Sequence, residues 1–224
     1  MSTSTTEIVQ RYRLISIFYD VLWENILALG KGRNPRQVLA DRIPDQPLRI
    51  LDLCSGTGNG SLSIGKAHAQ NQIIGVDLSP AMLAIASSKI RQQRISNLAL
   101  HQMNVARLGF AAAEFDVVMV SFGLHDVGYE VMLDILRESH RVLKTGGQLY
   151  IVDYAQEGGW LQQKLFSAYI RASYPARVRA FLAYDWQSIL AEVGFDLQET
   201  EICFISKLIW AEKNGNKPAP PNPA

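Results

Sequence analysis

The chain has 224 residues, enough for one α/β domain with a sizeable core but short for two. Its net charge is +1 and charged residues make up 19%, a balance that argues against a nucleic-acid-binding surface. The polar first residues and the absence of any apolar run of about 18 residues argue against a signal peptide and a membrane-spanning helix.

The N-terminal part of the chain predicts helices. Apolar residues at three- and four-residue steps predict an amphipathic helix over 7–29, and a second helix is expected over 35–43. Neither is needed to build a sheet, so residues 7–43 are expected to be cap helices that cover the sheet or its ligand. The tail 214–224, rich in Pro and Asn, is predicted to be disordered, which leaves a single domain over 1–213.

A glycine-rich turn between a strand and a helix comes next. Residues 48–53 are a short apolar run typical of a buried parallel strand, and three glycines follow within residues 56–60. A helical pattern continues through 62–67. This order places a ligand at the helix N-terminus, where free N–H groups and the helix dipole favour negative charge. Two ligands suit such a loop: a dinucleotide, through its pyrophosphate, or S-adenosylmethionine, through its carboxylate.

Asp52 indicates which of these two ligands suits the loop better. It lies four positions before Gly56, where a carboxylate would repel a pyrophosphate but attract an α-ammonium group or lie favourably near a sulfonium. The dinucleotide fingerprint also requires a third glycine at position 61, where this chain has Ser61. The structural alternative is a loop that binds nothing, in which Asp52 only caps a turn.

A second strand, 73–77, ends in Asp77, which falls 19 residues beyond Gly58. A carboxylate in that place can accept hydrogen bonds from both ribose hydroxyls of a bound nucleoside, although it could instead cap the next helix. That helix is predicted over 81–94, with Ser79 as N-cap followed by proline. Met82, in its first turn, lies near where an adenine would bind.

Two further predicted strands are each followed by candidate site residues. Residues 98–103 are followed by Asn104, whose amide could meet the adenine edge or could be an ordinary turn residue. The strand 115–121 is the clearest in the chain. Because ligands in open α/β sheets bind outside the carboxyl ends of the strands, His125 and Asp126 lie where chemistry would occur.

The C-terminal half completes the sheet. A helix over 131–143 and a strand over 148–153 precede an aromatic-rich segment, 155–186, which is expected to be a helical substrate cover. After a short helix over 186–193, two closing strands are predicted at 195–204 and 206–213, too close together for anything but an antiparallel pair. The fold class is therefore α/β: a doubly wound, Rossmann-like, seven-stranded sheet, parallel with one antiparallel edge strand.

With these motifs the chain resembles the class I S-adenosylmethionine-dependent methyltransferases, and most closely the ubiquinone/menaquinone-biosynthesis C-methyltransferase (UbiE-like) group, over most of residues 12–213. The blocks that carry the resemblance are Tyr19-Asp20, Leu51-Asp-Leu-Cys-Ser-Gly-Thr-Gly58, Gly75-Val-Asp77, Phe115-Asp116, Ser121-Phe-Gly-Leu124 and Arg141-Val-Leu-Lys-Thr-Gly-Gly147. After Ser-Phe-Gly-Leu that group usually has Arg-Asn-Val, whereas this chain has His125-Asp126-Val127. This difference puts the quinone substrate in doubt, but not the cofactor.

The resemblance implies a site for S-adenosylmethionine. The residues it assigns are Asp52, Gly56 and Gly58 to the methionine portion, Asp77 to the ribose, Leu78, Met82, Asn104 and Val105 to the adenine, and Tyr19, Ser55 and Ser121 to the same site. The chemistry would be an SN2 displacement on a sulfonium, in which the protein aligns the nucleophile and excludes water.

A phenol-like acceptor must lose a proton, and His125 is the candidate base. Asp126 is its candidate partner, although adjacent residues on extended backbone point apart. The alternative is that His125 is a loop residue that caps the next helix. Cys54 and Cys203 are expected to be reduced residues of a cytoplasmic protein, with no disulfide and no metal site.

The predicted function is methyl transfer to a small molecule: a quinone precursor, another aromatic metabolite or a lipid amine headgroup. A lipid substrate would bring the protein to a membrane surface. Two other functions compete with this one. Asp52 and Ser61 disfavour an NAD-dependent oxidoreductase, and turnover with an acceptor would exclude a non-catalytic S-adenosylmethionine-binding partner protein.

Overall fold

The computed structural model describes residues 34–155, 163–164, 166–167, 176–203 and 206–215. Its elements are α2 (Pro35–Arg42), β1 (Arg49–Leu53), α3 (Asn59–Ala67), β2 (Gln72–Asp77), α4 (Pro80–Gln93), β3 (Leu98–Gln102), β4 (Phe115–Ser121), the 3-10 turn η1 (Leu124–Asp126), α5 (Tyr129–Val142), β5 (Leu143–Tyr154), α7 (Ala176–Leu182), α8 (Trp186–Glu192), β6 (Phe195–Cys203) and β7 (Ser206–Lys213).

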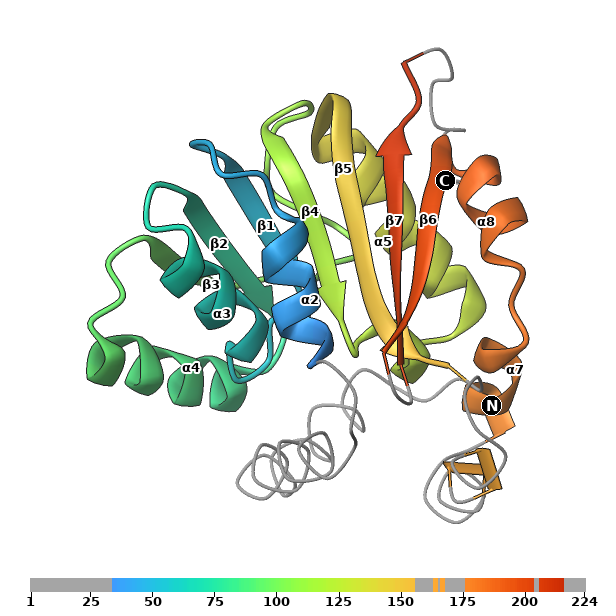
Figure 1. The fold of residues 1–224 in the computed structure, drawn as a ribbon, viewed down its shortest axis with the longest axis horizontal. Helices are drawn as coiled ribbons and strands as arrows, with labels where there is room; N and C mark the ends of the chain where they lie inside the picture. Colours follow the sequence, from blue (N-terminus) through green and yellow to red (C-terminus); the bar gives the residue numbers. More distant parts are fainter. Residues whose placement is uncertain (1–33, 156–162, 165, 168–175, 204–205, 216–224) are drawn as a thin grey trace.

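The strands form one seven-stranded sheet in the order β3-β2-β1-β4-β5-β7-β6. Strands β1 to β5 pair in parallel, and β7 pairs antiparallel with both β5 and β6. This confirms the predicted doubly wound sheet with a single antiparallel strand at one side, which the closing hairpin supplies. That strand is β7, and β6 lies outside it (Figure 1).

Alternation along β4 divides the core into two layers. Val117 and Met119 pack in the cluster that includes residues of α2 and α3, whereas Val118 and Val120 pack in the cluster that includes residues of α5 and α8. Successive side chains of a strand point to opposite faces, so a strand covered on both faces is apolar throughout. Helices therefore cover both faces of the sheet (Figure 1).

The predicted helix starts and strand ends are largely confirmed. Ser79 caps α4 by accepting from the Met82 N–H, and a proline follows as its first residue. One boundary differs: α5 ends at Val142 and β5 begins at once with Leu143, whereas the sequence predicts that this strand begins only at residue 148. Residues 144–147 bulge out of the ladder, because the β4–β5 register jumps between Phe115 and Val117.

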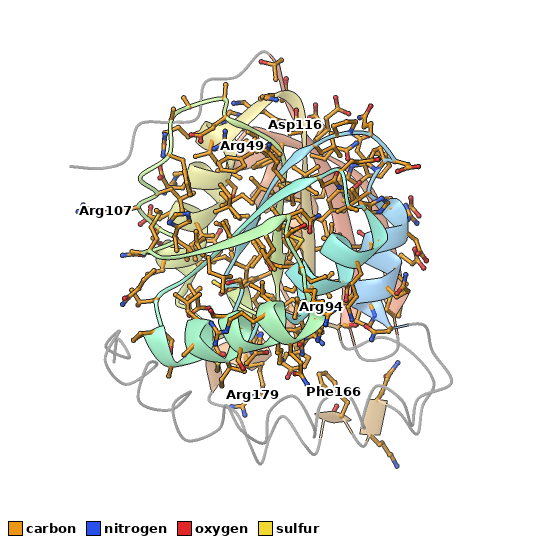
Figure 2. The ribbon with its side chains drawn as sticks, turned by 90° about the vertical axis from the view of Figure 1, so that its left-hand side faces the viewer. Arg49, Arg94, Arg107, Asp116, Phe166 and Arg179 are labelled. Carbon is orange, nitrogen blue, oxygen red and sulfur yellow. The ribbon has the colours of Figure 1, made fainter. Side chains whose placement is uncertain are left out.

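The carboxyl ends of β1, β2, β4 and β5 meet at one edge of the sheet. Asp52 is in register with Gly75, Asp77 with Gln102, and Ser121 with Val152. The opposite edge carries Arg49 and Asp116, well separated from Phe166 and Arg179 (Figure 2). Parallel strands with aligned ends thus bring the polar residues that follow them together.

Two parts of the predicted organisation lie partly or wholly outside the described residues. The helix predicted over 7–29 and the tail 216–224 lie outside them, while the helix predicted over 35–43 is α2. Of the segment 155–186 expected to cover the substrate, α7 packs against η1. The assignment of that segment as a substrate cover stays a prediction. Among the described residues, no helix has both the length and the apolar character needed to cross a bilayer.

Candidate active site

The turn between β1 and α3 has a backbone that only glycine adopts without strain. Gly56 has φ of +53° and Gly58 has φ of +81°, both in the left-handed region. A Cβ atom at Gly58 would lie 3.0 Å from Ala86 Cβ of α4, so this glycine also permits close packing of the two helices. The first turn of α3 therefore presents its N–H groups toward the edge where the strands end.

Asp52 is buried beneath that turn at 1% exposure. The Ser61 hydroxyl donates a hydrogen bond to Asp52 Oδ2, whereas Oδ1 has no hydrogen-bond partner among the described residues. Burial raises the pKa of Asp52 to about 7, although the Ser61 hydrogen bond and the positive charge of Arg36 both lower it. A buried carboxylate with a free oxygen is well suited to a cationic ligand, which would restore its ionised form.

Asp77 organises the loop from the end of β2. Its Oδ2 accepts from the Gly56 N–H at 2.8 Å, and its Oδ1 accepts from the Ser79 N–H at 2.8 Å. Burial is the largest influence on the pKa of Asp77 and raises it, while the backbone hydrogen bonds lower it. Asp77 therefore joins the glycine turn to the start of α4, and its assignment to the ribose stays a prediction.

The residues predicted to meet the adenine lie at the start of α4 and directly after β3. Met82 is 4% exposed in the first turn of that helix, and Leu78 is half-buried. Asn104 is exposed, and its Oδ1 accepts from the Ala106 N–H at 3.0 Å. Val105 is half-buried. Asn104 thus forms a turn hydrogen bond through its side-chain oxygen, and its assignment to the adenine stays a prediction.

Two serine hydroxyls are buried near the loop without a hydrogen-bond partner among the described residues. Ser121 Oγ, at the end of β4, lies 3.5 Å from where a Cβ of Gly60 would be, and Asp52 Oδ2 lies 3.6 Å from the same point. Ser55 Oγ lies 3.1 Å from where a Cβ of Gly75 would be, so it faces β2. Glycine at position 60 therefore leaves room for Ser121 and Asp52 beneath α3.

His125 is 1% exposed in η1, directly beyond the end of β4. Its Nδ1 lies 2.7 Å from Asp153 Oδ1 at the end of β5, and Asp126 Oδ2 lies 3.4 Å from its Nε2. Asp153 Oδ2 also accepts from the backbone N–H groups of Leu124 and His125, and its Oδ1 from that of Tyr154. The principal partner of His125 is thus Asp153, which the sequence did not single out, and Asp126 lies on the other side of the ring.

The chain contains the groups that S-adenosylmethionine needs. The cofactor carries an ammonium group, a carboxylate, a sulfonium and two ribose hydroxyls. The described residues offer the free Asp52 Oδ1, the partnerless Ser121 hydroxyl and the positive-φ turn at Gly56 and Gly58. Partnerless buried polar atoms require an explanation, and a polar ligand supplies one. The residues present therefore fit the cofactor.

The sequence did not lead us to select three residues of this region. Thr57 is buried in the glycine turn, Arg36 is buried in the first turn of α2, and Asp153 pairs with His125. Only Asp153 carried a usable signal, because it is an acid at the end of an apolar strand. Tyr19, the remaining predicted residue, lies outside the described residues.

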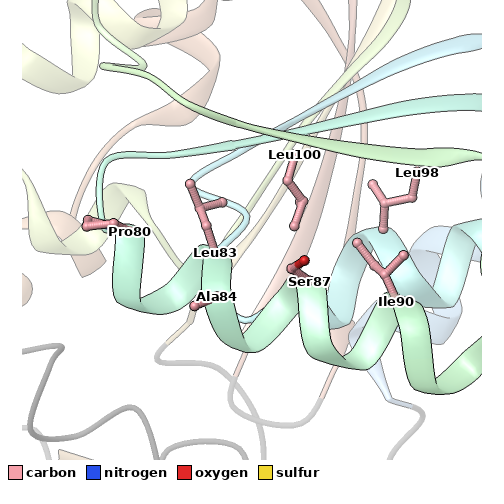
Figure 3. A pocket seen from close by; sticks show the side chains of 7 residues that line it. All are labelled: Pro80, Leu83, Ala84, Ser87, Ile90, Leu98 and Leu100. Atoms are coloured by element: carbon pink, nitrogen blue, oxygen red, sulfur yellow. The ribbon is translucent and has the colours of Figure 1, made fainter.

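A separate cavity of about 440 Å³ lies between α4 and the edge strand β3 (Figure 3). It is lined by Pro80, Leu83, Ala84, Ser87, Ile90, Leu98 and Leu100. Its lining holds no charged group, and its one hydroxyl, that of Ser87, accepts a hydrogen bond from Arg91.

The chain matches the model of the ubiE/COQ5 methyltransferase family over residues 1–190. It is 28% identical over 193 residues to the demethylmenaquinone methyltransferase of Alkalihalophilus pseudofirmus, an alignment that covers 85% of this chain and 80% of that protein. It is 32% identical over 191 residues to the demethylmenaquinone methyltransferase of Lactiplantibacillus plantarum, covering 84% and 77%. It is 33% identical over 144 residues to the demethylmenaquinone methyltransferase of Listeria welshimeri, an alignment that covers 61% of this chain and 59% of that protein.

Solved structures share the fold at low identity. A SAM-dependent methyltransferase from Aquifex aeolicus aligns with a TM-score of 0.64 and 17% identity, over 80% of this chain and 89% of that one. The [4+2]-cyclase SpnF aligns with a TM-score of 0.69 and 18% identity, over 96% and 97%. Because a cyclase shares it, the fold alone does not define the reaction. The family match over most of the chain does: the protein belongs to the ubiE/COQ5 methyltransferase family and is an S-adenosylmethionine-dependent methyltransferase.

Proposed function

We propose that this enzyme methylates a ring carbon of a quinol, in the manner that the name demethylmenaquinone methyltransferase implies for its relatives. The observation that carries the proposal is the buried hydrogen bond between His125 Nδ1 and Asp153 Oδ1, at 2.7 Å, beyond the ends of β4 and β5. A quinol becomes a carbon nucleophile when a hydroxyl loses its proton, and an oriented imidazole is suited to accept that proton. Once the ring carbon has taken the methyl group, its own hydrogen leaves as a proton and the ring becomes aromatic again.

The cofactor is proposed to lie across the glycine turn. Asp52, Gly56 and Gly58 would hold its methionine portion and Asp77 its ribose, with Ser55 and Ser121 close by. The residues proposed around the adenine are Leu78, Met82, Asn104 and Val105. Bound S-adenosylmethionine would supply a methyl group on a sulfonium, already activated for displacement, and would leave as S-adenosylhomocysteine when the carbon–sulfur bond breaks. Tyr19 is proposed to border the same site.

Asp153 fixes which nitrogen of His125 acts as the base. An ionised carboxylate only accepts hydrogen bonds, so the short contact means that Nδ1 carries a hydrogen. The neutral ring then has its lone pair on Nε2, which is the nitrogen that takes the hydroxyl proton. Three backbone N–H groups, those of Leu124, His125 and Tyr154, hold the carboxylate in place.

Asp126 would act after the proton arrives. Its Oδ2 lies 3.4 Å from Nε2, close enough to stabilise the positive charge that the ring gains. Tyr154 and Phe181 pack on the imidazole with ring centroids 4.6 Å and 6.3 Å away, so the base lies in an apolar setting that strengthens these charge interactions. His125 and Asp126 therefore remain the proposed catalytic residues, with Asp153 as a positioning residue.

The acceptor is tested with short-chain demethylmenaquinol, its oxidised quinone, and phosphatidylethanolamine, each incubated with S-adenosylmethionine and analysed by mass spectrometry. We expect a methylated product from the quinol alone, because the oxidised ring is an electrophile and has no hydroxyl proton to give up. Methylation of the amine alone would refute the proposal.

The base is tested by kinetics. His125→Ala should lower kcat by about 10²- to 10⁴-fold, the usual contribution of a positioned base, with little change in cofactor affinity. Asp153→Asn should cost about as much, and the double variant no more, because the two residues act as one unit. Asp116→Asn is the control, since Asp116 lies at the opposite edge of the sheet (Figure 2) and should affect stability only. A variant at position 125 that keeps its rate and pH profile would exclude the base.

A further inference from the structure

Arg36 is a buried cation without an anionic partner among the described residues. It is 8% exposed in the first turn of α2, where its backbone N–H donates to the Asn34 side chain. No described carboxylate forms an ion pair with its guanidinium, whereas Arg42 of the same helix pairs with Glu199 and Glu201. Buried charges in proteins are paired, so a partnerless guanidinium in a binding region points to an anionic ligand.

The guanidinium lies against the end of β4. Its Cζ is 5.5 Å from the centroid of the Phe122 ring, and Phe122 directly follows Ser121. A ring face attracts a cation but does not satisfy the planar set of N–H donors that a guanidinium carries. The aromatic contact therefore orients Arg36 and leaves its hydrogen-bonding capacity for something else.

Asp52 lies on the same face of the sheet. Asp52 is two residues from Ile50 of β1 and so points to the same face, where Ile50 packs in the cluster that includes residues of α2 and α3. The charge of Arg36 reaches Asp52, because it lowers the pKa of that carboxyl group against the larger opposite effect of burial. No ion pair joins these two described residues, so a buried cation and a buried anion are presented to the same region at a distance from each other.

We propose that Arg36 binds the α-carboxylate of S-adenosylmethionine while Asp52 binds its α-ammonium group. The two protein charges are opposite and separate, which complements the two charges of a zwitterionic amino acid. The inference rests on the proposed placement of the cofactor at the glycine turn, and it is independent of which acceptor is methylated. A carboxylate on the acceptor is the other possible source of the same chemistry.

Calorimetric titration with S-adenosylmethionine and with decarboxylated S-adenosylmethionine tests the assignment. We expect the unmodified protein to bind the complete cofactor about 10- to 100-fold more tightly, as one charged hydrogen-bonded pair allows. Arg36→Gln should bind both ligands with similar affinity, close to that of the unmodified protein for the decarboxylated form. Arg36→Lys should keep part of the preference, and it provides a second variant if Arg36→Gln does not fold.

Arg42→Gln is the matched control, because it removes a cation from the same helix and should leave the ratio of the two affinities unchanged. If Arg36→Gln weakens both ligands equally, Arg36 supports the pocket and the assignment is overturned. If the ratio stays the same but KM rises for 1,4-dihydroxy-2-naphthoate and not for naphthalene-1,4-diol, the carboxylate belongs to the acceptor and the assignment is again overturned. Failure of the unmodified protein to bind either ligand would instead contradict the placement of the cofactor.

Discussion

Replacing Asp52 by asparagine should stabilise the unliganded protein at neutral pH and weaken its binding of S-adenosylmethionine. Asp52 is 1% exposed and has one oxygen without a hydrogen-bond partner among the described residues. Burial is the main reason that its pKa rises from 3.8 to about 7 in the folded protein. An ionised Asp52 is therefore a cost to the folded state that an uncharged amide would not carry.

The pKa shift of Asp52 determines the sign and the size of the change in stability, because proton binding and folding are linked. A carboxyl group whose pKa is raised on folding contributes stability that is full below its unfolded pKa of 3.8 and is lost as the pH rises to about 7. A change of about 3 pKa units corresponds to at most about 4 kcal/mol. Asp52→Asn should thus have the same stability as the unmodified protein near pH 4. Its advantage should grow toward pH 7 and stay constant above that.

Urea unfolding of both proteins at pH 5, 6, 7 and 8 measures the difference between their free energies of unfolding. The contributions of all other titrating groups cancel in this difference, because both proteins contain them. A difference that does not depend on pH, or a variant less stable at pH 8, would show that Asp52 is not the strained group inferred here.

The same substitution should weaken S-adenosylmethionine binding by about 1.5–3 kcal/mol, the usual contribution of a hydrogen bond between charged groups. A cation bound at Asp52 favours its ionised form, so binding near pH 7 should release about half a proton more from the unmodified protein than from the variant. Calorimetry in two buffers of different ionisation enthalpy measures that release. Equal affinity and equal proton release in both proteins would refute the role of Asp52 in holding the cofactor.

Three further substitutions, with Gly146→Ala as a control for the first, test the rest of the site. Gly56→Ala and Gly146→Ala both place a side chain at positive φ in uncrowded surroundings, so each should lose about 1–2 kcal/mol of stability. Only Gly56→Ala should also abolish S-adenosylmethionine binding by calorimetry, and retained binding would mean that the loop does not cradle the ligand. Asp77→Asn should weaken the binding of S-adenosylmethionine by about 2 kcal/mol or more, because hydrogen bonds to the ribose are lost. An unchanged dissociation constant would mean that Asp77 only holds the glycine turn and the start of α4 in place and does not bind the ribose. Ser61→Ala removes the donor to Asp52 and should raise the pKa of Asp52, so that cofactor affinity is reduced at pH 7 and largely restored at pH 8.5. A deficit that is the same at both values would contradict this coupling.

The local elements of this protein could be predicted because short-range chemistry determines them. The apolar run of β4 fits only a buried strand, and Ser79 followed by proline is a helix start in almost any context. Asp52 and Asp77 could be selected because each is an acid in or at the end of a predicted parallel strand, and such ends gather at one edge. The sequence alone thus determined the strands and most helices of the described residues, and it selected the two acids that are proposed to hold the cofactor.

The partners of the charged groups were decided only by tertiary structure. Asp153 reaches His125 because β5 pairs with β4 in a register that places Val152 beside Ser121, and the bulge in that pairing has no clear local signal. Arg36 meets Phe122 because α2 packs against α3, β5 and β7, which places its first turn beside the residue that follows β4. Hydrogen bonds and charge contacts act over a few ångströms, so they depend on the packing of residues far apart in the chain and not on the spacing of neighbours.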